Sequence, residues 1–140
     1  MSQYKEDNYM GVEGYYDNYD KRRQFVSHLI KFDKDQMFEI NLGHLLGLTV
    51  DQICLYARPQ FNYLIMRHLK QAMIDGTDME KVKFMANIDF TYSHIILIED
   101  AFRSGLTLEE IKTFISPERE YNDIYNDYHK ILDKKNNATE

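Results

Sequence analysis

The residue types best suited to chemistry in this chain are five histidines and one cysteine. The histidines are His28, His44, His68, His94 and His129. They follow no metal-binding spacing, because no His-Glu-x-x-His segment occurs and Cys54 has no Cys/His ligand pairing. No spacing fixes a histidine beside that thiol as a base, and no glycine-rich loop could hold a phosphate group. The sequence therefore predicts a protein that is not an enzyme and that carries no cofactor and no metal.

One alternative retains a chemical role for two of the histidines. His68 and His94 could approach each other across neighbouring helices, and Glu99 or Asp100 could complete a ligand set. That arrangement would make the protein a metal-dependent regulator or an enzyme. His44, by contrast, is expected to be a half-buried packing residue, because the equivalent positions elsewhere in the chain are apolar.

The chain repeats itself with a period of 29 residues, marked by Phe32, Phe61 and Phe90. Small residues and glycines recur in the same register behind each phenylalanine, and the two prolines occupy equivalent positions of the first and third units. A fixed period of this length is typical of stacked-repeat proteins, which usually work by presenting a surface to a partner. The three units are 32–60, 61–89 and 90–118.

Each unit predicts a long helix followed by a short one. A residue suited to capping a helix follows each recurrent phenylalanine, and an apolar face at helical spacing then runs to a glycine. A second capping residue starts the short helix. The first caps are Asp33, Asn62 and Thr91, the glycines are Gly47, Gly76 and Gly105, and the second caps are Thr49, Asp78 and Thr107. We therefore expect an all-α fold, a short α-solenoid of three helix-turn-helix repeats with N- and C-terminal capping helices.

The segments that flank the repeats predict the domain boundaries. Residues 21–133 are expected to form a single helical-repeat domain, with capping helices after Asp20 and after Pro117. Residues 1–20 carry five acids and one lysine without apolar periodicity, which predicts a flexible, acidic, tyrosine-rich arm. Residues 134–140 predict a polar tail.

The first unit is also similar to a known type of repeat. Its pattern comprises Phe32-Asp33, Gln36-Met37 with Ile40, Gly47-Leu48, and Tyr56-Ala57-Arg58-Pro59 before Phe61. This pattern resembles the short helical repeats of proteins from low-GC Gram-positive bacteria, many of which are carried by phages and other mobile elements. The middle unit departs from it at Thr77 and at Asn87-Ile88, where the turn proline is absent. The resemblance implies a phage or mobile-element origin and brings no biochemical activity with it.

Composition limits the partners and the location. The chain is 44% hydrophobic and has a formal net charge of −6, whereas binding to a nucleic-acid backbone needs a basic surface. No apolar run has transmembrane length, residues 1–4 do not open a signal peptide, and the lone Cys54 suits a reducing compartment. These features predict a cytoplasmic protein that binds neither nucleic acid directly nor a membrane, and they leave its oligomeric state open.

The leading functional hypothesis is a non-enzymatic protein-binding module whose partner has a basic surface. In its sharpest form, the protein is a phage- or mobile-element-encoded inhibitor that blocks a host nucleic-acid-handling defence enzyme. The alternative is a scaffolding adaptor that self-associates or tethers other proteins. The candidate binding residues could instead solubilise the arm, pack over turns or form an ordinary solvated surface. They are Tyr9, Tyr15, Tyr16, Tyr19, Tyr63, Tyr92, Glu99, Asp100, Glu109 and Glu110.

Overall fold

A computed structural model describes residues 31–138 of the chain, and these residues form seven α-helices and no strand. Long and short helices alternate along the sequence. The described part of the chain is therefore all-α, as predicted. The helices are α3 (Lys34–Leu45), α4 (Val50–Tyr56), α5 (Tyr63–Ile74), α6 (Met79–Met85), α7 (Tyr92–Arg103), α8 (Leu108–Lys112) and α9 (Tyr121–Ala138).

The long helices begin at the predicted caps. The side chains of Asp33, Asn62 and Thr91 each accept the backbone N–H three residues further on, which the helix itself cannot satisfy. Because these caps recur every 29 residues, α3, α5 and α7 each contain 12 residues and occupy the same positions of the unit. The short helices begin after Thr49, Asp78 and Thr107, also as predicted.

The recurrent glycines end the long helices. Gly47, Gly76 and Gly105 have φ values of 95°, 85° and 92°, in the left-handed region that residues with a Cβ rarely adopt. In the first unit, the Leu48 N–H then reaches back to the Gly43 carbonyl oxygen at 3.0 Å. This bond satisfies a carbonyl group at the end of the helix and turns the chain toward α4.

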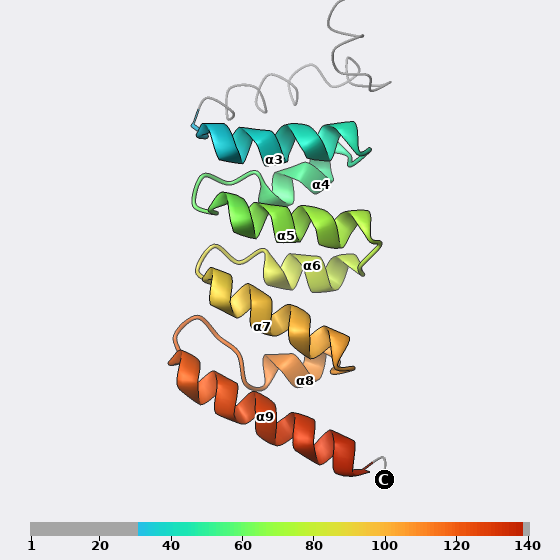
Figure 1. Cartoon of the computed structure of the whole chain (residues 1–140), viewed down its shortest axis with the longest axis vertical. Coiled ribbons are helices and arrows are strands. Elements are labelled where there is room, and N and C mark those ends of the chain that lie inside the picture. The colour runs from blue at the N-terminus through green and yellow to red at the C-terminus, as the bar shows by residue number, and fades with distance from the viewer. Residues whose placement is uncertain (1–30, 139–140) are drawn as a thin grey trace, which may run out of the picture.

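The helices stack in chain order. Figure 1 shows α3, α5, α7 and α9 lying side by side, with a short helix between each consecutive pair. Equivalent residues of successive units meet in one core between the long and the short helices. Its repeated members include Ile40, Leu69 and Ile98 from the long helices and Ile53, Val82 and Ile111 from the short ones. The arrangement is compatible with the predicted three-repeat α-solenoid.

The last helix continues the period as a fourth long helix. It begins at Tyr121, 29 residues after Tyr92, and buries Ile124 at the position that Ile95 holds in α7. The helix extends through Ala138 and so includes residues 134–138 of the segment that the sequence predicts as a polar tail.

The side of α9 opposite its buried residues is polar, which suits the end of a stack. Ile124 and Tyr128 face the neighbouring α7, and the exposed residues on the opposite side carry no apolar side chain. Those exposed residues are Asn122, Asp123, Asn126 and Lys130. The predicted N-terminal capping helix and the arm fall within residues 1–30, outside the described residues.

Candidate binding surface

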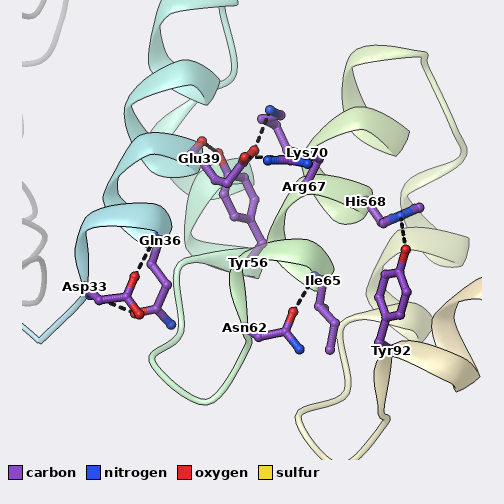
Figure 2. A network of polar contacts seen from close by, with 10 residues as sticks. All are labelled: Asp33, Gln36, Glu39, Tyr56, Asn62, Ile65, Arg67, His68, Lys70 and Tyr92. Carbon is purple, nitrogen blue, oxygen red and sulfur yellow. Dashed lines mark hydrogen bonds and ion pairs between the residues drawn. The ribbon is translucent and has the colours of Figure 1, made fainter.

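A buried ion pair joins α3 to α5 inside the stack, as Figure 2 shows. Lys70 Nζ donates to Glu39 Oε1 at 2.7 Å, and Arg67 Nε donates to Glu39 Oε2 at 3.0 Å. Glu39 and Lys70 are 1% and 3% exposed, whereas Arg67 reaches solvent. Each carboxylate oxygen therefore has a cationic donor, which offsets the large cost of burying the charge.

A tyrosine of α4 ties the backbone of α3 beside this pair. Tyr56 OH donates to the carbonyl oxygen of Glu39 at 2.8 Å. Burial, and to a smaller extent the charge of Glu39, raises the pKa of Tyr56. Gly43 makes room for this ring, because a Cβ there would collide with the tyrosine hydroxyl. In the third unit, the residues equivalent to Gly43 and Tyr56 are Ala101 and Phe114. The alanine is larger than the glycine, and the phenylalanine lacks the hydroxyl group that would collide with it.

The next interface uses the same two positions for a histidine and a glutamate. His68 Nδ1 lies 2.7 Å from Glu99 Oε1, and Tyr92 OH lies 3.3 Å from His68 Nε2. The partners in both interfaces are 31 residues apart, one repeat plus two residues. The acid lies on the earlier helix in the first interface and on the later helix in the second.

The chain of Glu99, His68 and Tyr92 has the residue types of an acid–base relay, but its register indicates a structural role. It occupies the positions at which Glu39 and Lys70 hold the preceding pair of helices together. Stacking α3 directly on α7 would place Glu39 opposite Glu99, and like charges facing each other oppose such an arrangement. The two pairs are therefore consistent with the observed order in which the long helices stack.

His94 does not join His68, in contrast to the alternative metal or enzyme hypothesis. Its Nδ1 accepts the Thr91 N–H at 2.9 Å and closes a capping box, while Nε2 is buried without a hydrogen-bond partner in the described structure. Burial lowers the pKa of His94 and that of His44, which is half-buried as predicted. Within residues 31–138, no three His, Cys, Asp or Glu side chains form a group that could hold a metal ion.

Several acids predicted to face a partner already have partners within the stack. Glu99 is paired with the α5 histidine described above. Asp100 accepts a hydrogen bond from Tyr128 OH at 2.7 Å, and Glu110 accepts one from Lys135 Nζ at 2.9 Å. The hydrogen bond from Lys135 is the main cause of the lowered pKa of Glu110. These contacts reduce the carboxylate charge that residues 90–118 can offer to another molecule.

The remaining predicted binding residues differ in how they are placed. Glu109 is exposed on α8, 3.7 Å from Lys112. Tyr63 is exposed on α5, with the guanidinium carbon of Arg67 5.4 Å from its ring centre. Tyr92 is half-buried against the α5 histidine. The residues outside the described structure are Tyr9, Tyr15, Tyr16 and Tyr19.

Exposed apolar side chains gather on the solvent-facing side of the long helices. Of the eight large hydrophobic side chains exposed among residues 31–138, six occupy only the third, seventh and fourteenth positions of the 29-residue period. With 3.6 residues per turn, these positions fall within about 40° of one another around the helix. We name this surface the outer apolar face. Its members are Phe38 and Leu45 on α3, Tyr63 on α5, Ile96 on α7, and Tyr121 and Tyr125 on α9.

Sequence reasoning identified one member of this face, Tyr63, and missed the others. A signal for two of them was present, because Tyr121 follows Tyr92 by one full period and Tyr125 lies one turn further along the same helix. The buried pair of Glu39 and Lys70 was also missed. Its signal is an acid and a base separated by one repeat plus two residues.

Comparison of the chain with protein-family models, curated proteins and solved structures finds no significant match. In the described part of the chain, no helix is both long enough and apolar enough to cross a bilayer. Functional inference therefore depends on the geometry of the stack and its surface.

Proposed function

We propose that the protein is a non-enzymatic binding module that contacts another protein through the outer apolar face. The observation that carries this proposal is the recurrence of exposed apolar side chains at three repeat positions on successive helices. Isolated exposed apolar residues are ordinary, whereas a group spread over neighbouring elements is typical of an interaction surface. Tyrosine, which supplies three of the six members, is enriched among the residues that dominate binding energy.

The interior of the stack supports the same proposal. A buried ion pair links α3 to α5, a half-buried polar pair links α5 to α7, and Tyr128 links α9 to Asp100 on α7. A face held in one arrangement by such contacts loses little conformational entropy on binding. Stacked repeats are suited to this work, because their adjacent helices form one extended surface.

The inhibitor of a host nucleic-acid-handling enzyme is a narrower form of the proposal. It requires residues 90–118 and the arm to occupy a basic groove through charge. Glu99, Asp100 and Glu110 already have cationic or hydrogen-bonding partners within the stack. Salt screens interactions between exposed charges but not apolar contacts. We therefore expect apolar contacts to dominate the binding and the affinity to fall only slightly as the salt concentration rises.

Site-specific crosslinking tests the proposed surface directly. A photoreactive benzoylphenylalanine replaces Tyr63 or Tyr125 in the cells that produce the protein, and a control variant carries it at exposed Lys83 on α6. We expect the same protein to be crosslinked from both outer positions and not from the control. The captured partner is then purified and titrated with a Tyr63→Ser, Tyr125→Ser double variant.

The double variant is expected to bind the purified partner at least ~10-fold more weakly, since truncating anchor residues costs more than about 1 kcal/mol each. Crosslinks from Lys83 but not from the tyrosine positions would contradict the proposal, as would unchanged affinity of the double variant. Repeating the titration at high salt separates the two forms of the proposal, because the charge-led form predicts a steep loss of affinity.

A further inference from the structure

A hollow of about 670 Å³ opens between α5, α6 and α7. Its less exposed lining combines the apolar side chains of Ala72, Met85 and Phe102 with polar ones, whereas Asp75 and Asp78 are exposed. Both α5 and α7 contribute residues to the hollow and to the outer apolar face. Its volume is comparable with that of pockets that bind small molecules, so a long side chain of another protein can enter it.

The hollow lies where the middle unit departs from its neighbours. The first and third units bury Leu48 and Leu106 immediately after the glycine that ends the long helix. The middle unit has the smaller, polar Thr77 at this position, and Thr77 lines the hollow. The smaller Thr77 therefore fills less of this space than a leucine would.

The cations that line the hollow are already engaged. Lys81 Nζ lies 4.6 Å from the ring centre of Phe102, in a cation–π contact. Arg103 lies 3.7 Å from Asp100, a carboxylate outside the hollow. Neither cation is therefore committed to the two exposed aspartates.

Those two aspartates contact only residues close to them in the chain. Asp75 accepts a hydrogen bond from Gln71 Nε2 at 2.9 Å, and Asp78 caps α6 by accepting the Glu80 N–H at 3.2 Å. Neither carboxylate forms an ion pair with another residue in the range 31–138. Glu99 adds a third carboxylate to the lining, from a separate helix, and this one is already paired with His68, which also lines the hollow.

We propose that this hollow receives an arginine side chain of the protein that docks on the outer apolar face; the inference rests on the function proposed above. A guanidinium group pairs with carboxylates through two hydrogen bonds, and its planar face and methylene groups pack on aromatic and aliphatic side chains. One arginine therefore complements both the two exposed aspartates, which form no ion pair within residues 31–138, and the apolar side chains of the lining. The net charge of −6 favours approach of the same partner.

A short peptide serves as the probe for this site. The peptide acetyl-Ala-Leu-Arg-Leu-Ala-amide is titrated into the full-length protein, and the amide signals are followed by two-dimensional NMR. A matched peptide carries citrulline, which has the shape of arginine without its charge. We expect saturable shifts of the amides of Gly76, Thr77 and Phe102 with the arginine peptide, and at least ~10-fold weaker binding of the citrulline peptide.

Three variants locate the binding. Thr77→Leu fills the hollow with the residue found in the neighbouring units, and it should abolish the peptide-induced shifts while raising the melting temperature. Asp75→Asn should weaken binding of the arginine peptide several-fold. Asp133→Asn is the matched control, because Asp133 is exposed on α9 at the position equivalent to Asp75, and it should leave binding unchanged.

Equal affinity for the two peptides would overturn the inference, and so would shifts that persist in Thr77→Leu. An Arg22→Ala, Arg23→Ala variant is also measured without peptide. Changes in the amide signals of the hollow in this variant would assign the site to this chain's own arginines and would overturn the inference. Partner binding that survives Thr77→Leu but is lost in Tyr63→Ser, Tyr125→Ser would refute the arginine site and leave the proposed function standing.

Discussion

The buried pair of Glu39 and Lys70 offers the sharpest test of how the stack is held together. Lys70→Met keeps an unbranched side chain but removes the ammonium group from a carboxylate that is 1% exposed. Removing one partner of a buried ion pair costs about 3–5 kcal/mol. Arg67 still donates to the second oxygen of Glu39 at 3.0 Å, so we expect the lower end. A loss of about 3 kcal/mol reduces the folding equilibrium constant by roughly 100-fold.

A double-mutant cycle separates the pair from ordinary packing. Glu39→Leu is the matched change, because Leu97 is buried at the equivalent position of the third unit. The free energy of unfolding of the double variant is expected to lie within about 1 kcal/mol of that of the original protein, since replacing a buried pair by apolar residues is often neutral. Urea denaturation followed by circular dichroism gives the four free energies of unfolding, with an expected coupling of at least about 2 kcal/mol. A cost of Lys70→Met below about 1 kcal/mol, or additive costs in the cycle, would refute this reasoning.

Three further predictions concern stability. Because burial lowers the pKa of His94, the stability that it contributes is complete above its ordinary pKa of 6.5 and is lost as the pH falls toward the lower folded-state value. His94→Gln copies Gln36, the capping-box residue of the first unit. This change should reduce the loss of stability at acidic pH, measured as the midpoint of urea denaturation at pH values below 6.5, and an unchanged pH profile would contradict the prediction. Gly43→Ala should reduce the free energy of unfolding by about 1–3 kcal/mol, because the added methyl group overpacks the core. Adding Tyr56→Phe should recover part of this loss in thermal unfolding; no recovery would show that the hydroxyl is not the obstacle. Alanine at Gly47, Gly76 or Gly105 should cost about 1–2 kcal/mol each, because nothing lies near the added Cβ and only the left-handed backbone opposes it; markedly unequal costs in denaturation would argue against that cause.

The helix boundaries could be predicted closely, because they depend on groups that are near one another in the chain. The hydroxyl of Thr49 or Thr107 reaches an N–H three residues away, and the bond that closes the turn after Gly47 spans five residues. The end of the last helix was placed too early. The polar residues after 133 carry no strong stop signal, and α9 continues to Ala138.

The candidate surface could be predicted only in part. Tyr63 was found from the repeat, whereas the exposure of Phe38 and Leu45 was not, because an apolar residue in a helical pattern is normally assigned to the core. The acids of the third unit posed the opposite difficulty. Their charges are visible in the sequence, but the partners of Asp100 and Glu110 lie 28 and 25 residues further along the chain.

By itself, the sequence determined the all-α class, the 29-residue period and the start of each long helix, since caps such as Asp33 and glycines such as Gly76 act on their immediate neighbours. The tertiary structure alone decided which side chains meet between units. Glu39 finds Lys70, and His68 finds Glu99, only when successive helices stack in one register. Contacts across 31 residues depend on the packing of the whole core, which short-range hydrogen bonds do not specify.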